Sequence, residues 1–355
     1  MIITSGTRLT TLLTNVFLLI SGTSMLLFGL PACLDVPSSA CLAASQPKAR
    51  YLGLEFLGSS QVSQLEIEKY LGLKTGSYVT NPVKNIEKLN NELVKRNLEA
   101  NIELVPQGDD SFILAVDIID HNSGLPTRRL RFPRHVQVTT EKPFQILEEL
   151  RIRQDKLEEG GRPVNSTYQQ GVKTFEDEPM NQLCQQMLKY VPGMQNEIIE
   201  VIHSDPDPKR RLNAIGLLNW SGNFPQALTE LLPALDDADS SVRSATARFY
   251  AARLDLLPKE FSLSDLVDSL NRQLQRPSHS DRQAALSCLN KLSKTKPKSG
   301  KFIKTLSEAN IKKISKQSQV PSVRDTANQI LSTLIQVDTS SDTEEEENSE
   351  VDSGI

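Results

Sequence analysis

The sequence DADSSVRSATARFY, residues 237–250, contains the pattern that decides the fold of most of this chain. Aspartate and serine precede Arg243 and can cap a helix that begins there. A small residue stands three positions after the arginine, and bulky apolar residues stand at the sixth and seventh positions. The small residue lets a second helix approach closely, and the bulky residues fill the layer between the helices.

This pattern occurs four times, and its arginines, Arg211, Arg243, Arg282 and Arg324, lie 32, 39 and 42 residues apart. A period of about 40 residues with two helices in each unit is typical of HEAT repeats. Apolar residues at spacings of three and four predict partner helices over 225–235, 263–274 and 302–315, and a first helix over 181–202. We therefore predict a right-handed α-solenoid of HEAT-type repeats over residues 181–335.

These repeats and the apolar N-terminal segment resemble secreted bacterial HEAT-repeat proteins. In HEAT units the arginine pairs with the aspartate of an adjacent turn, so the resemblance implies that Arg211, Arg243, Arg282 and Arg324 are structural repeat anchors. The alternative is that these arginines form a ladder that binds phosphate or acidic groups.

The first 45 residues have the composition of a targeting segment. A nearly uncharged run from 12 to 30 follows a short head whose one basic residue is Arg8. Three outcomes fit this segment: a secretory signal cleaved near Ala44, an uncleaved membrane anchor, or lipid attachment at Cys33. The last is suggested by Leu-Pro-Ala-Cys at 30–33, which looks like a lipobox with an unusual proline.

Residues 46–120 have the pattern of a small α+β domain. Strands are predicted over 51–57, 100–106 and 112–119. Ser63 and Glu66 form the capping box of a first helix, and Asn81-Pro82 begins a second. The expected order is strand, helix, helix, strand, strand.

This order, Gly58 after the first strand, and the sequence LGLKTG at 71–76 resemble a POTRA domain, a periplasmic module of outer-membrane assembly and secretion machinery. The resemblance implies that the domain has no catalytic residues. It also implies that an exposed sheet edge or groove receives another polypeptide by strand addition. The alternative is an unrelated small α+β domain.

Residues 121–180 are predicted to be a connecting segment with a helix over 141–156 and a linker over 163–179. Four arginines gather near its start, and they form a candidate surface for an acidic partner or anionic lipid head groups: Arg128, Arg129, Arg131 and Arg134. The alternative is a solvated strand edge that is protected by charge. Residues 336–355 are acidic and serine-rich, which predicts a disordered tail.

No motif for catalysis, cofactor binding or metal binding stands out. The four histidines are scattered, and His203 is expected to be a solvated residue at a helix end. Cys184 and Cys288 lie on apolar helix faces and are expected to be buried. The net charge of −4 gives no global basic field, which argues against nucleic acid as a partner.

The sequence therefore predicts a non-enzymatic protein-binding scaffold or adaptor, exported to the periplasm or cell envelope and either soluble or membrane-anchored. Its partner would be another protein. The alternative is a structural envelope protein that associates with itself through its solenoid. Some HEAT-like repeats occur in enzymes that attach bilin chromophores, but the export signal argues against that activity.

Overall fold

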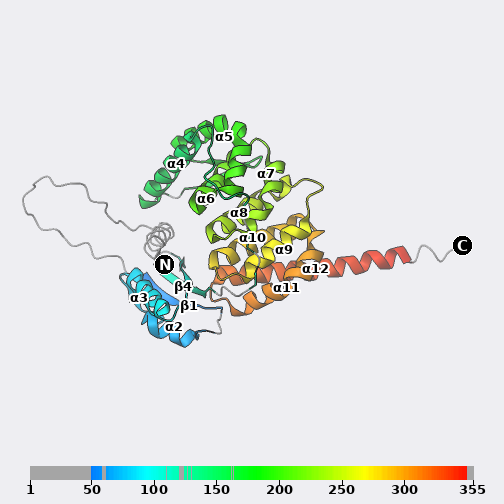
Figure 1. Cartoon of the computed structure of the whole chain (residues 1–355). Helices are drawn as coiled ribbons and strands as arrows, with labels where there is room; N and C mark the ends of the chain where they lie inside the picture. The colour runs from blue at the N-terminus through cyan, green and yellow to red at the C-terminus, as the bar shows by residue number, and fades with distance from the viewer. Residues whose placement is uncertain are drawn as a thin grey trace, which may run out of the picture. The chain divides into compact units, whose positions relative to one another are not determined.

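The computed structural model describes residues 49–57, 61–108, 110–119, 124–125, 127–128, 130–160, 162 and 164–349, with the backbone alone for residues 337–349. The predicted targeting segment and Cys33 lie outside these residues. The chain divides into two compact units: residues 1–119 with 152–164, and residues 120–151 with 165–355. A small α+β domain is followed by a mainly helical region, as the sequence predicted (Figure 1).

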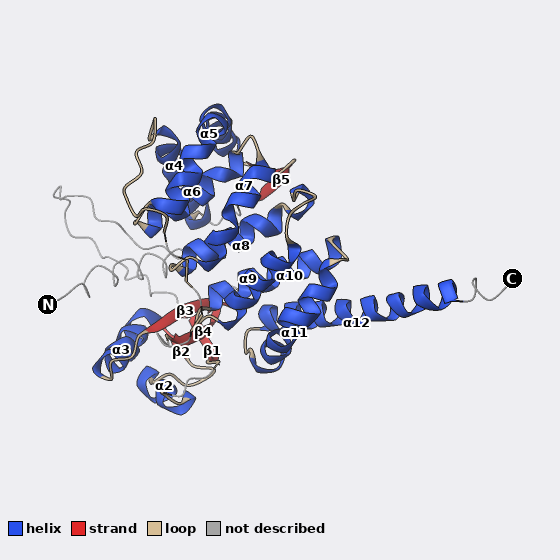
Figure 2. Ribbon diagram, turned by 45° about the vertical axis from the view of Figure 1, so that its right-hand side comes forward, coloured by secondary structure: helices blue, strands red, loops and turns tan. Residues whose placement is uncertain are grey.

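The first unit is built on a mixed four-stranded sheet in the order β2-β1-β4-β3 (Figure 2). Strand β1 runs parallel to β4, and the other pairs are antiparallel. The predicted order of strands and helices is observed, with the two-residue strand β2 in addition, which is too short to show a periodicity. The elements are β1 (Ala49–Glu55), α2 (Gln64–Leu71), β2 (Tyr78–Val79), α3 (Pro82–Lys95), β3 (Ala100–Pro106) and β4 (Ser111–Ile118).

Local sequence signals fix the helix ends in this unit. The Ser63 side chain accepts a hydrogen bond from the Glu66 N–H, and the Glu66 carboxylate accepts one from the Ser63 N–H, so the predicted capping box is confirmed. Asn81 caps α3 just before its first-turn proline. The apolar faces of α2 and α3 then share one core with the sheet, in which Ile67, Leu89 and Leu114 are buried.

The second unit consists mainly of helices, and α4 (Lys142–Glu159) runs across the division between the units. A short hairpin, β5 (Ser166–Gln169) and β6 (Val172–Phe175), precedes the main helical run. The elements that follow are α5 (Glu178–Ser204), α6 (Pro208–Leu217), η1 (Leu218–Trp220), α7 (Phe224–Leu231), η2 (Leu232–Asp236), α8 (Ser240–Ala252), η3 (Leu254–Leu256), α9 (Leu263–Gln275), α10 (His279–Thr295), α11 (Ser299–Gln317) and α12 (Pro321–Ser349).

These helices form two layers. Helices α6, α8, α10 and α12, which carry the four predicted arginines, pack in series, each against the next. In the other layer α5 contacts α7, η2 contacts α9, and α9 contacts α11. The small residues three positions after the arginines are fully buried between the helices, as predicted: Ala214, Thr246, Ala285 and Ala327. Close helix approach at these positions follows from their size.

Two segments differ from the sequence predictions. The expected linker over 163–179 contains the β5–β6 hairpin, because β-branched and aromatic residues flank a Gln170-Gly171 turn in which both residues have positive φ. Helix α12 continues to Ser349, into the segment that was expected to be disordered. Its glutamates have good helix propensity, and the helix is already nucleated by its packed first half.

Candidate functional site

The buried arginines of the second unit join neighbouring helix pairs. The Arg211 guanidinium donates to both carboxylate oxygens of Asp237, at 3.1 Å from Nε and 2.7 Å from Nη2. Its Nη1 donates to the carbonyls of Asp205 and Pro206 in the turn before its own helix, at 2.9 and 3.1 Å. One side chain therefore ties its own turn to the next one.

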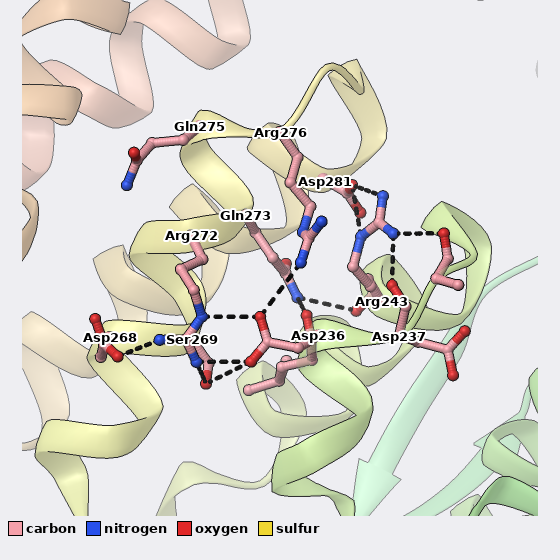
Figure 3. A network of polar contacts seen from close by, with 12 residues as sticks. Asp236, Asp237, Arg243, Asp268, Ser269, Arg272, Gln273, Gln275, Arg276 and Asp281 are labelled. Carbon is pink, nitrogen blue, oxygen red and sulfur yellow. Dashed lines mark hydrogen bonds and ion pairs between the residues drawn. The ribbon is translucent and has the colours of Figure 1, made fainter. Parts of the chain in front are cut away.

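Arg243 repeats this arrangement one unit later. Its Nη1 donates to the carbonyls of Asp237 and Ala238, at 2.6 and 2.9 Å, and its Nε donates to Asp281 at 2.9 Å (Figure 3). Asp237 therefore accepts from Arg211 through its side chain and from Arg243 through its backbone. We call Arg211, Asp237, Arg243 and Asp281 the arginine–aspartate ladder.

The third and fourth arginines keep the bond to their own turn. Arg282 donates to the carbonyl of Arg276 at 3.2 Å, and Arg324 donates to that of Ser318 at 3.4 Å. In all four units the accepting carbonyl stands six residues before the arginine. In the first two units the residue six positions before the arginine is an aspartate. In the third unit it is Arg276, and Arg243 pairs with the carboxylate of Asp281 instead. The four predicted anchors thus occupy equivalent places.

The pKa of Asp237 shows why this buried residue of the ladder stays ionised. Burial by itself would raise the pKa of this carboxyl. Hydrogen bonds from Arg211 and the Asp239 N–H, with the charges of Arg128 and Arg211, outweigh burial and lower the pKa below its ordinary value. Asp237 therefore remains an ionised carboxylate although it is buried, and its negative charge compensates the positive charges of Arg128 and Arg211.

A second polar cluster lies beside the ladder, around Asp236. Arg272 donates to both carboxylate oxygens of Asp236, at 2.9 and 2.6 Å, and Arg276 approaches it at 3.5 Å (Figure 3). Gln273 donates to the carbonyl of Leu235 at 2.8 Å. These contacts join α9 to η2, so the cluster is another structural link within the stack.

The arginines of the predicted basic surface are not all exposed in the structure. The Arg128 side chain is only 8% exposed, and its Nη2 donates to Asp237 and to the Ile202 carbonyl, the latter at 2.7 Å. Arg128 therefore extends the ladder, and the prediction that it binds a partner is corrected for this reason. Arg129 lies outside the described residues. Arg131 and Arg134 are exposed, in agreement with a surface role.

Between these exposed arginines the chain presents an aromatic side chain. Phe132 is 85% exposed and has a φ of 42°, a left-handed conformation that is costly for a bulky residue. Hydrogen bonds on both sides hold this conformation: the Arg131 N–H donates to the His203 carbonyl at 3.0 Å, and the Arg134 N–H donates to the Ser204 carbonyl at 3.1 Å. We call residues 131–134 the basic tip.

His203, on which the basic tip rests, is buried rather than solvated. Its side chain is 3% exposed, with Nδ1 3.4 Å from Arg128 and Nε2 3.4 Å from Glu230. Burial, then the charges of Arg131 and Arg128, lower the pKa of the imidazole, although Glu230 opposes them. The expectation of a solvated helix-end residue is wrong, because the 128–136 segment covers this end of α5.

Arg253 forms a further buried cation that the sequence did not reveal. Its guanidinium lies over the rings of Phe249, Tyr168 and Phe224, at 4.0, 4.8 and 4.9 Å, and donates to Asn219. Burial lowers the pKa of Arg253 to about 10. Aromatic rings stabilise a desolvated cation in this geometry. The spacing of Phe249 and Arg253 was the only local sequence signal for this cation–π site, because Tyr168 comes from the distant hairpin.

Cys184 and Cys288 are buried, as predicted, and burial raises the pKa of their thiols to about 11 and about 12. Within the described part of the chain, no three His, Cys, Asp or Glu side chains gather as a metal site would require. Among the helices described, none has the length and apolar character needed to cross a membrane.

Comparison of the chain with protein-family models, with curated proteins and with solved structures finds no match.

Proposed function

We propose that the chain is a non-enzymatic, protein-binding scaffold of the bacterial cell envelope. Its helical region would be an α-solenoid of HEAT type, and the ladder supports this reading because it joins successive helix pairs at equivalent positions. Buried ion pairs of this kind fix the relation of neighbouring units and leave the outer surfaces for partners.

The basic tip is the feature that supports this proposal most directly. Backbone strain in a bulky exposed residue persists only where the surrounding structure enforces it, and such strain is concentrated at functional sites. Aromatic and arginine side chains are also the types most enriched at the centres of protein interfaces. Phe132, between Arg131 and Arg134 and held by two backbone hydrogen bonds, has the preorganised form of such an anchor.

The α+β domain would supply a second binding element, in the manner of a POTRA domain. The register of β2 with β1 comprises only two residue pairs, Ala49 with Val79 and Arg50 with Tyr78. Tyr78 and Leu52 are exposed along this side of the sheet. A short edge strand with exposed apolar side chains is suited to the addition of an extended segment from another polypeptide.

Site-specific photo-crosslinking in intact cells tests the proposal. A benzophenone amino acid is placed at position 132 or 78, and at Val94, which is exposed on α3, as the control. We expect an adduct with a defined second polypeptide from 132 or 78, and none from 94. Adducts that contain only copies of this chain would instead support the self-associating structural protein. Equal labelling from all three positions would refute a specific binding surface.

A further inference from the structure

An irregular segment closes the C-terminal end of α5, and the proposed function uses only its exposed tip. We call Arg128 with residues 130–136 the strap; none of these residues lies in a helix or strand. The last three carbonyls of α5 accept hydrogen bonds from the strap: Ile202 from the Arg128 Nη2 at 2.7 Å, His203 from the Arg131 N–H at 3.0 Å, and Ser204 from the Arg134 N–H at 3.1 Å. Carbonyls at a helix end have no intrahelical partner, so the strap is the cap of α5.

A buried histidine lies under the strap. The Arg128 Nη1 is 3.4 Å from Nδ1 of His203, and the Glu230 carboxylate of α7 is 3.4 Å from Nε2. A guanidinium only donates hydrogen bonds, so Nδ1 accepts, and the proton of the neutral imidazole is on Nε2, facing Glu230. Burial, and then the charges of Arg131 and Arg128, lower the pKa of His203, which keeps the imidazole neutral at about pH 7.

A second proton on this imidazole conflicts with the strap. It can bind only at Nδ1, the atom that accepts from Arg128, and the contact then joins a donor to a donor. Two like charges also come to lie 3.4 Å apart inside the protein, with Arg131 as a further positive charge nearby. The opposing carboxylate of Glu230 is 39% exposed, so water screens part of its attraction for the imidazolium.

The strap, and not the histidine, is the part that can move. His203 is fixed in the last turn of α5, and the carbonyls of that turn can bond to water when the strap leaves. Asp237, the other partner of Arg128, keeps its bonds from Arg211 at 3.1 and 2.7 Å. Detachment of the strap is therefore local and leaves the arginine–aspartate ladder intact.

The other titratable groups of this junction do not explain a release near neutral pH. One oxygen of Asp205 accepts from the Val136 N–H at 3.2 Å and lies 3.3 Å from His135 and 3.2 Å from Arg210. Protonation of His135, which is exposed, strengthens its attraction to Asp205 and holds the strap more firmly. Glu200 contacts the exposed Arg134 and the Ser204 hydroxyl, at 3.5 and 2.8 Å.

We propose that the strap is an acid-sensitive switch, in which protonation of His203 at Nδ1 expels Arg128 and detaches the strap from α5. The basic tip is part of the strap, and its bonds to α5 enforce the left-handed conformation of Phe132. Acid therefore abolishes the preorganised anchor while the stack stays folded. The consequence for partner binding rests on the proposed function, whereas the detachment itself does not.

Hydrogen exchange of the full chain, read by mass spectrometry on peptides that cover 130–136, tests the detachment. A substitution at position 203 leaves the sequence around these amides unchanged, so the ratio of exchange rates between variant and wild type cancels the pH dependence of chemical exchange. As the pH falls from about 7.5 to 5, we expect the wild-type strap to lose protection about tenfold relative to His203→Asn, whose side-chain oxygen accepts from Arg128 and does not titrate. Equal loss in both proteins would assign the transition to another group, such as Asp205, and overturn the proposal.

Two further variants keep the test decisive if asparagine at 203 does not hold the strap at neutral pH. His135→Asn makes the same substitution at the exposed histidine of the strap and should leave the transition in place; its disappearance would overturn the proposal. Glu230→Gln removes the carboxylate that favours the imidazolium, so the release should move to lower pH by about half a unit or more. An unchanged midpoint in this variant would also overturn it.

Photo-crosslinking from position 132 separates the switch from the proposed function. We expect the adduct with the partner to decrease over the same pH range as the protection of the strap, and to persist in His203→Asn. An adduct that is undiminished while the strap is released would overturn the control of binding. No adduct at any pH, with the transition of the strap intact, would refute the binding surface and leave the switch standing.

Discussion

Two arginine-rich regions of this chain look alike in sequence and differ in the structure. In the ladder, Arg211 and Arg243 are buried, and each holds a carboxylate and two carbonyls. In the basic tip, Arg131 and Arg134 are exposed. Their backbone N–H groups are hydrogen-bonded, and the Arg134 side chain makes only an exposed ion pair with Glu200 at 3.5 Å. The difference teaches that the helix position of an arginine, and not its charge, decides whether it stabilises the fold or remains available to a partner.

Removal of a ladder arginine should have the largest effect. Arg243→Ala leaves the buried Asp281 carboxylate without this cation, and loss of one partner of a buried pair costs about 3–5 kcal/mol. We expect a large drop in the midpoint of thermal and urea unfolding. Arg243→Lys should recover only part of it. An unfolding midpoint unchanged by Arg243→Ala would show that the ladder does not hold the stack.

Substitution of Arg128 tests whether this residue belongs to the ladder or to the basic tip. It belongs to the basic segment in sequence but bonds to Asp237 in the structure. Because Arg211 still pairs with Asp237 in its absence, Arg128→Ala should cost about 1.5–3 kcal/mol, the value of a hydrogen bond to a charged group. Urea unfolding measures this loss. A change as small as that of Arg134→Ala would place Arg128 in the tip after all.

His203 makes the junction sensitive to pH. Its pKa is lowered by folding, so between that value and about 6.5 the unfolded chain binds more protons than the folded one. This contribution to stability is complete above about pH 6.5 and is lost as the pH falls through the folded value. We expect His203→Asn to flatten the fall in unfolding free energy as the pH drops below about 6.5. Identical pH profiles for both proteins would contradict this.

The basic tip should have the smallest effect on stability. Arg134→Ala removes an exposed ion pair with Glu200 at 3.5 Å and should change the unfolding free energy by less than about 0.5 kcal/mol. Phe132→Gly should be neutral or slightly stabilising, because glycine adopts positive φ without cost. Both should nevertheless weaken cross-linking to a partner from position 78 or from a probe at 131. A marked fall in melting temperature would make the tip a structural element.

Much of the helical region followed from periodic spacing, because the arginine and the residues three, six and seven positions later lie on one helix and are fixed by local geometry. The capping box at Ser63 was readable for the same reason. The cage around Arg253 could not be predicted, since Tyr168 and Phe224 reach it from separate elements. The burial of Arg128 and His203 also depends on how an irregular segment lies against α5. An irregular segment has no periodic sequence pattern from which this packing could be predicted.

Asp237 accepts bonds from Arg128 and Arg211 and, through its carbonyl, from Arg243, so three consecutive segments of the chain meet at one residue. Because α6, α8, α10 and α12 pack in series, such a shared residue raises the coupling between neighbouring helix pairs. Unfolding should therefore begin at α11 and α12, beyond the last ladder pair, and proceed towards α6. Hydrogen exchange would record this as a gradient of protection along the stack, with the slowest amides in α6 and α8.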